Sequence, residues 1–134
     1  MPPSGGTPWG DCLYEHPQPS SDVYVNSFGN THLNVGVTLR CGSHDRPGKT
    51  GFGVRHIKDG PGFNEYTECC VELVVMTARS LPPGSGQNNQ VLKYSKDGVT
   101  GVVVFDVNRK NVVTAYTQGS GGDGNWHGCT SKLA

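Results

Sequence analysis

The sequence predicts an α+β fold in which one main amphipathic helix packs on an antiparallel β-sheet. Two observations predict it. Segments on both sides of the centre of the chain alternate apolar and polar residues or are rich in valine, as strands are. One central segment instead repeats apolar residues every three or four positions, as a helix with one buried face does. The predicted order is two strands, the helix and three strands.

The chain has 134 residues, which suits one domain. We expect a single domain over 1–134 in three parts: an irregular arm over 1–20, a core over 22–118 and a glycine-rich tail over 119–134. The 20 glycines and 9 prolines predict that much of the chain is loop, in the arm and the tail above all.

The strands are predicted from alternation and from the turn residues between them. Turns are expected at residues 28–30 and 41–49, where glycine, asparagine, aspartate and proline gather. The predicted strands are residues 22–26, 32–40, 90–95, 100–107 and 111–118.

The helix is predicted over residues 63–81. Asn64 suits an N-cap, and Pro82 is expected to stop the helix. Valine and leucine also alternate over residues 69–76, so a strand there is the competing interpretation.

The last predicted strand divides its side chains between two faces. Alternation sends Val113, Ala115 and Thr117 to one face, and Val112, Thr114 and Tyr116 to the other. The helix is expected to cover the face with Val113 and Ala115. Thr114 and Tyr116 then stand about 7 Å apart on the open face. Two hydroxyls on a rigid strand can bind a phosphate, although both are also ordinary strand residues.

Charge and hydropathy limit the possible functions. There are 11 basic and 11 acidic residues, so the net charge is zero and the pI is about 6.9. This argues against a protein that holds nucleic acid by charge alone, but not against an enzyme that must release RNA. No window of about 18 apolar residues predicts a membrane span. The N-terminus lacks a signal peptide pattern, so we expect either no export or a delivery signal elsewhere.

The five cysteines include no C-x-x-C pair, which argues against a zinc ribbon or a thioredoxin-like motif. At least one disulfide is expected from two of Cys12, Cys41 and Cys129, and it would tie the arm or the tail to the body. Cys69 and Cys70 lie in the apolar segment and are expected to be free or core thiols. Five reduced thiols in a cytosol is the alternative.

The strongest chemical signal is Arg55-His56, which follows a run of glycines and is followed by Lys58. Histidine titrates near neutrality and is the usual general acid or base. Arginine offers a planar fork that suits a phosphate. RNA transesterification needs a base, an acid and groups that stabilise charge on phosphorus. The sequence therefore predicts an acid–base site at this pair.

A second candidate is Trp126-His127, because an aromatic ring and an imidazole can clasp a base. The other histidines are expected in solvent. His16 and His44 lie in loops, and His32 begins a strand.

Three segments together resemble a known family. Residues 51–57 (GFGVRHI), an amphipathic segment and a valine-rich hairpin that ends in VVTAY resemble the toxin ribonuclease domains of bacterial polymorphic and contact-dependent inhibition systems. These belong to the superfamily that groups barnase, EndoU, colicin-type tRNases and RelE. Residues 103–130 also look like the end of the fungal guanyl-specific ribonucleases. The resemblance covers roughly residues 35–130.

The resemblance implies a helix on a twisted antiparallel sheet, with RNA across the open face. It implies cleavage of RNA, often tRNA, without a metal or cofactor, leaving a 2′,3′-cyclic phosphate. Arg55 and His56 match the Arg-His motif of the family, and Thr114 and Tyr116 match its Thr-x-Tyr motif. It also implies a monomer with a cognate immunity protein, secreted or delivered as the C-terminal toxin part of a larger protein.

The sequence departs from the family at two places. Relatives often carry a second histidine where this chain has Gly60-Pro61. Tyr116 stands where the fungal enzymes have a catalytic histidine. The general acid is therefore left open between Tyr116 and His127, with Lys58 as the alternative means of neutralising the leaving group. The competing function is a small, disulfide-stapled extracellular binding module without catalysis.

Overall fold

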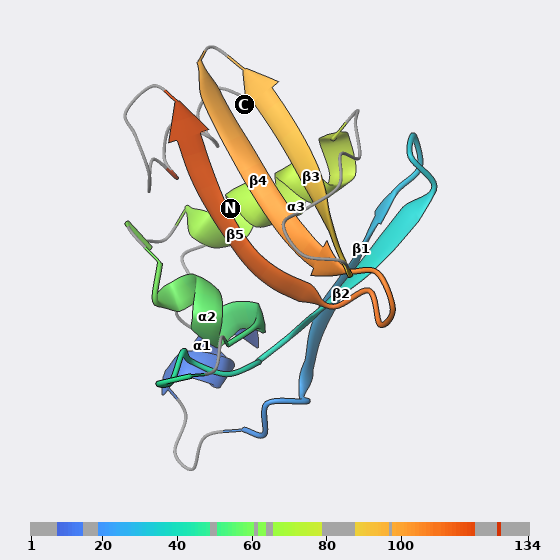
Figure 1. Cartoon of the computed structure of the whole chain (residues 1–134). Helices are drawn as coiled ribbons and strands as arrows, with labels where there is room; N and C mark the ends of the chain where they lie inside the picture. The colour runs from blue at the N-terminus through green and yellow to red at the C-terminus, as the bar shows by residue number, and fades with distance from the viewer. Residues whose placement is uncertain are drawn as a thin grey trace.

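The computed structural model describes residues 8–14, 19–48, 51–60, 62–63, 66–78, 88–96, 98–119 and 126. Within these ranges the chain forms three helices, a two-stranded sheet and a three-stranded sheet, both antiparallel (Figure 1). The predicted α+β fold is confirmed, with the difference that the strands form two sheets. None of the helices in these ranges is long and apolar enough to cross a membrane.

The first sheet is a hairpin of β1 (Tyr24–Asn30) and β2 (Val35–Arg40). The turn predicted at 28–30 is wrong, because those residues complete β1 and the turn follows at 31–34. Asn30 explains the shift. It is buried, its Nδ2 donates to the carbonyls of Val75 and Ala78, and its Oδ1 accepts the N–H of Leu33. A single asparagine thus closes this turn and joins β1 to the central helix.

The second sheet has the order β3 (Asn89–Lys96), β4 (Val99–Asp106), β5 (Val112–Gly119). A bulge interrupts the pairing of β4 with β5, because Val104 pairs with Thr114 while Phe105 pairs with Val112. The bulge turns Val112 into the core, where it is fully buried. The prediction that Val112 shares a face with Thr114 is therefore wrong.

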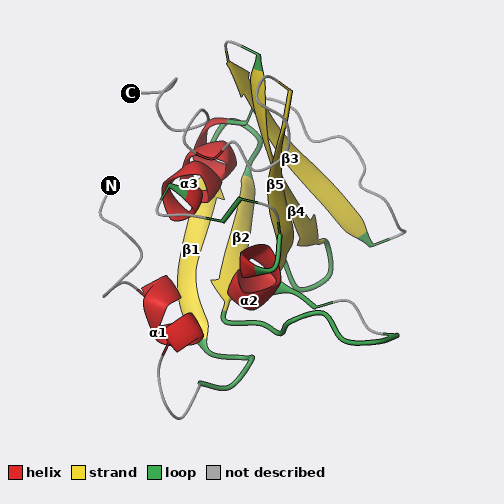
Figure 2. Cartoon of the chain, turned by 90° about the vertical axis from the view of Figure 1, so that its left-hand side faces the viewer, coloured by secondary structure: helices red, strands yellow, loops and turns green. Residues whose placement is uncertain are grey.

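The central helix, α3 (Thr67–Thr77), packs against β1, β3 and β4. Figures 1 and 2 show it on one side of the three-stranded sheet. The competing strand over residues 69–76 is wrong. The helix begins after Tyr66, four residues later than predicted, and the proposed cap Asn64 lies outside the described residues.

Two short helices were not predicted from the sequence. The first, α1 (Pro8–Tyr14), lies in the arm expected to be irregular, and its Trp9 is buried in the core. The second, α2 (Gly53–Lys58), contains the Arg-His pair and packs against α1, β2 and β5. Both are too short to show a helical repeat in the sequence, so only their packing stabilises them.

The disulfide between Cys12 and Cys41 ties α1 to the end of β2, as predicted. Cys69 is a buried free thiol, which also agrees with the prediction. Cys70 was also expected to be a free or core thiol, and this prediction is wrong because Cys70 is disulfide-bonded. Cys129 lies outside the described residues.

We predict two disulfides and one free thiol. Peptide mapping after alkylation without reductant should show Cys12 linked to Cys41, Cys70 in a second disulfide and Cys69 alkylated. Replacing Cys12 and Cys41 together with alanine should lower the free energy of unfolding by about 3–4 kcal/mol, since the bond closes a loop of 29 residues. Alkylation of all five thiols in the native protein would contradict this assignment.

Candidate functional site

The glycines before the Arg-His pair press α2 against the end of β2. Gly42 and Gly53 both have φ near +70° (72° and 73°), a conformation that other residues rarely adopt. A Cβ atom at Gly42 would collide with the carbonyl of Phe52, and one at Gly53 with the carbonyl of Arg40, so the two segments can approach this closely only with glycine at both positions. The N–H of Arg55 then donates to the carbonyl of Cys41. The glycine run thus fixes the position of α2.

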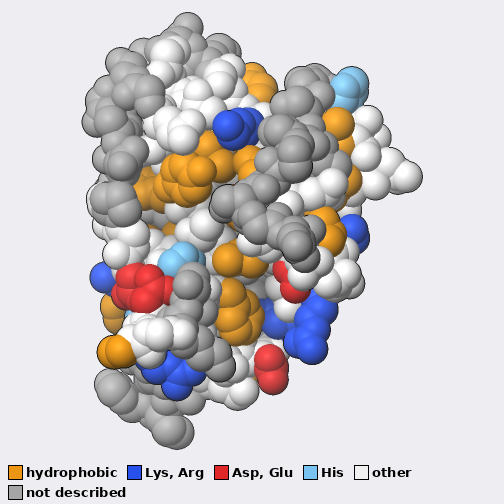
Figure 3. All heavy atoms as spheres, viewed as in Figure 1, with side chains coloured by type: hydrophobic (Ala, Val, Ile, Leu, Met, Phe, Trp, Pro, Cys, Tyr) orange, Lys and Arg blue, Asp and Glu red, His pale blue; other side chains and the backbone are white. Residues whose placement is uncertain are grey.

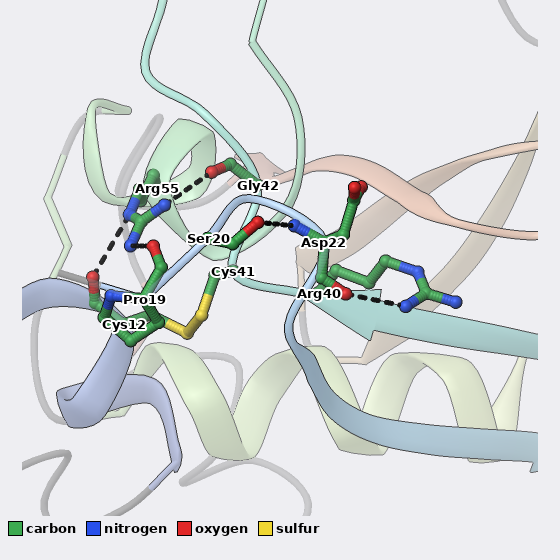
Figure 4. The surroundings of a disulfide bond; sticks show 8 residues. All are labelled: Cys12, Pro19, Ser20, Asp22, Arg40, Cys41, Gly42 and Arg55. Atoms are coloured by element: carbon green, nitrogen blue, oxygen red, sulfur yellow. Dashed lines mark hydrogen bonds between the residues drawn. A yellow bond between two sulfur atoms is a disulfide. The ribbon is translucent and has the colours of Figure 1, made fainter.

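Arg55 is a structural anchor (Figure 4). Its side chain is buried, with 6% of the residue exposed. Nε donates to the carbonyl of Cys12 at 3.1 Å, Nη1 to Gly42 at 2.9 Å and Nη2 to Pro19 at 2.6 Å. These contacts give Arg55 a structural role in place of the expected contact with a phosphate. They bind α2 to α1 and to the chain on either side of the Cys12–Cys41 disulfide.

His56 faces another way, because consecutive residues of a helix point about 100° apart. Its side chain is 17% exposed, and Nδ1 lies 2.8 Å from Oδ1 of Asp45. The distance is that of an ion pair, although the angles at Nδ1 are not those of a well-formed hydrogen bond. A carboxylate at Nδ1 favours the tautomer with its proton there, which leaves Nε2 as the reactive atom.

The Asp45 carboxylate is itself held in place. The Gly51 N–H donates to its Oδ1 at 2.7 Å. This hydrogen bond, followed by the charges of His56 and His44, holds the pKa of Asp45 below its usual value of 3.8. Asp45 therefore stays ionised at any pH near neutrality, as a partner that orients an imidazole must.

A pocket of about 240 Å³ opens between α2 and β5 and brings together three of the four predicted catalytic residues: His56, Thr114 and Tyr116. On β5, Ala115 points into the core between the two hydroxyl-bearing residues. No described residue hydrogen bonds to Nε2 of His56 or to either hydroxyl. The lining residues are Asp45, His56, Asp59, Gly60, Thr114, Ala115 and Tyr116.

A second ion pair braces the loop that carries Asp45. His44 Nδ1 lies 2.9 Å from both carboxylate oxygens of Asp59, at the end of α2. The loop and α2 are thus joined by two pairs: His44 of the loop lies against Asp59, and Asp45 of the loop lies against His56. Sequence reasoning missed both carboxylates. The sequence did contain a signal for them. His44 is adjacent to Asp45, and His56 precedes Asp59 by three residues, a spacing that brings two side chains together on a helix.

The remaining predicted residues lie elsewhere. Lys58 does not line the pocket, and its Nζ lies 5.3 Å from the centroid of the Phe63 ring. Trp126 is 2% exposed and belongs to the hydrophobic core, so its ring is not available to stack on a base. His127 lies outside the described residues.

No protein family, curated protein or solved structure matches this chain. The resemblance to toxin ribonucleases consequently stays a prediction from short motifs.

We predict that Arg55→Ala destabilises the protein by about 3 kcal/mol or more, because it removes a charged donor and leaves three carbonyl groups without the hydrogen bonds that Arg55 gives them. Arg55→Lys should recover little, since an ammonium cannot reach three carbonyls in the directions of the guanidinium fork. Urea unfolding followed by circular dichroism measures both. His56→Ala is the matched control and should change the free energy of unfolding far less. Equal stabilities of wild type and Arg55→Ala would contradict the anchoring role.

We predict a difference in acid stability between wild type and Asp45→Asn. Because the pKa of Asp45 is lowered on folding, its carboxylate stabilises the fold above about pH 4, and this contribution disappears as the pH falls through the lowered pKa. The stability of the wild type should thus fall more steeply than that of the variant between about pH 5 and pH 2. Parallel curves from urea unfolding over this range would show that the carboxylate is not stabilised by the fold.

Proposed function

We propose that this protein is an endoribonuclease that cleaves RNA by transesterification without a metal ion. The observation that supports the proposal is the pocket between α2 and β5. It combines an imidazole held by a carboxylate with two hydroxyls on a rigid strand. Attack of a 2′-hydroxyl on the neighbouring phosphate needs a base, an acid and hydrogen-bond donors for the charge that develops on phosphorus.

Each group has a role in this scheme. Nε2 of His56 takes the proton of the 2′-hydroxyl, whose oxygen then bonds to phosphorus. The bond from phosphorus to the 5′-oxygen breaks, and that oxygen takes a proton from the hydroxyl of Tyr116. The hydroxyl of Thr114 donates to a non-bridging oxygen. The products are a 2′,3′-cyclic phosphate and a free 5′-hydroxyl, so the atoms and protons balance.

The charges of the pocket set a condition on this scheme. Two carboxylates, Asp45 and Asp59, line the pocket, and among the described residues no lysine or arginine does. Each carboxylate lies beside a histidine, but a neutral His56, as the base role requires, does not cancel the charge of Asp45. The pocket therefore suits chemistry on one phosphate better than capture of a polyanion, and the chain must attract RNA through another surface.

The binding module without catalysis is the competing proposal. A recognition loop gains nothing from an imidazole oriented by a carboxylate toward a pocket, which favours the enzyme. The toxin role, the preference for tRNA, the delivery as part of a larger protein and the cognate immunity protein are proposed on the sequence resemblance alone.

We predict that the purified protein cleaves total tRNA in the presence of EDTA, and that end analysis finds 2′,3′-cyclic phosphates. Because proton transfer by a positioned base contributes about 10²–10⁴-fold, His56→Ala should lower the rate by that factor. His32→Ala is the matched control, since it removes an exposed histidine that does not line the pocket. Its rate should stay within a few-fold of wild type.

Tyr116→Phe separates two roles of the ring in the same assay. A loss comparable to that of His56→Ala would identify the hydroxyl as the acid, whereas a small loss would leave the general acid elsewhere. The proposal is overturned if no RNA is cut, if the ends are 5′-phosphates, or if folded His56→Ala cuts at the wild-type rate. An inert wild-type protein would favour the binding module.

A further inference from the structure

A second pocket, of about 510 Å³, lies where the hairpin of β1 and β2 meets the turn between β4 and β5. The turn is held there by the backbone, because the N–H of Thr38 donates to the carbonyl of Lys110 and Thr38 bridges Asn111. Its lining residues are Asp22, Arg40, Arg109 and Asn111. No residue of this pocket is shared with the first one.

Arg40 is already held in position in this pocket. Nε donates to Oδ1 of Asn111 at 3.2 Å, and Nη1 donates to the carbonyl of Asp22 at 2.8 Å. Nη2 has no partner among the described residues. A guanidinium fixed by two bonds and open on its remaining edge loses little entropy when it binds an anion.

The charge of this pocket differs from that of the first. Two guanidinium groups, from half-buried Arg40 and exposed Arg109, face one carboxylate, that of Asp22. Figure 3 shows Lys and Arg side chains gathered near the β4–β5 turn, on the same face as a histidine that lies next to acidic side chains. In a chain with net charge zero, this local excess of positive charge favours the binding of an anion.

We propose that the pocket around Arg40 and Arg109 binds a backbone phosphate of single-stranded RNA whose scissile bond lies in the pocket around His56. This inference rests on the proposed ribonuclease function. Asn111, just before β5, lines the second pocket and Thr114, on β5, lines the first, and at roughly 3.3 Å per residue they lie at most about 10 Å apart along the chain. A few nucleotides of a single strand span that distance across the sheet.

The chemistry of the lining selects the phosphate as the group that binds. Among the described residues no aromatic side chain lines the second pocket, so the proposal does not invoke stacking on bases there. Guanidinium groups bind phosphate oxygens in pairs of parallel hydrogen bonds. Binding at this pocket should consequently be independent of base sequence and sensitive to salt.

The test is binding of a fluorescently labelled, fully 2′-O-methylated single-stranded RNA, which cannot be cleaved, followed by anisotropy over a series of NaCl concentrations. Arg109→Gln is the informative variant, because Arg109 makes none of the hydrogen bonds that hold Arg40. The slope of log K against log salt should fall by about 0.7, the value for one phosphate contact on a single strand. The affinity at 0.15 M salt should fall about fourfold, for every base sequence tried.

Lys58→Gln is the matched control, since it removes one positive charge that lines neither pocket. It should leave the slope unchanged. An unchanged slope for Arg109→Gln, an equal loss for Lys58→Gln, or no binding by the wild type would each overturn the inference.

Cleavage assays separate this inference from the proposed function. If the wild type cuts RNA but Arg109→Gln keeps its salt slope, only the second pocket is wrongly assigned. If the wild type cuts no RNA, the proposed function fails whatever Arg109→Gln does in the binding assay. Cleavage of a dinucleoside phosphate, which is too short to reach the second pocket, should be the same for wild type and Arg109→Gln.

Discussion

The buried guanidinium of Arg55 holds together the part of the molecule on which the candidate site depends. A helix of six residues is not stable by itself in water, so α2 exists only because its neighbours hold it. Arg55 supplies three hydrogen bonds to carbonyls of segments that the chain separates, and the Cys12–Cys41 disulfide fastens the same region covalently. With α2 so fixed against β5, His56 can meet Thr114 and Tyr116 in one pocket.

Local features of the sequence predicted local features of the structure. The fold class and the shared face of Thr114 and Tyr116 follow from strand alternation, which depends on neighbours alone. The role of Arg55 could not be predicted from the sequence. Its partners are the main-chain carbonyl groups of Cys12, Pro19 and Gly42, and only tertiary packing brings these groups to it. Val112 was assigned to the wrong face for a similar reason, since a bulge is a property of a strand pair.

Under the proposed function, the two pockets would divide the tasks of a nuclease. The pocket at α2 offers an imidazole and two hydroxyls but little positive charge, whereas the described lining of the pocket at Arg40 and Arg109 offers positive charge but no imidazole or hydroxyl. An enzyme of this kind would attract RNA by a few contacts at one end and release its products readily. Zero net charge, which argues against a tight RNA binder, is compatible with such turnover.

The most direct test of the central claim, that His56 meets a phosphate of RNA, is a titration of the labelled histidine side chains by NMR. The added ligand is a 2′-deoxy dinucleotide, which has the scissile phosphate but no attacking hydroxyl. We expect the Nε2 resonance of His56 to shift on saturation, while His44 and His32 stay unchanged. No shift at His56, or a shift confined to His44, would contradict the assignment of the pocket as a ribonuclease site.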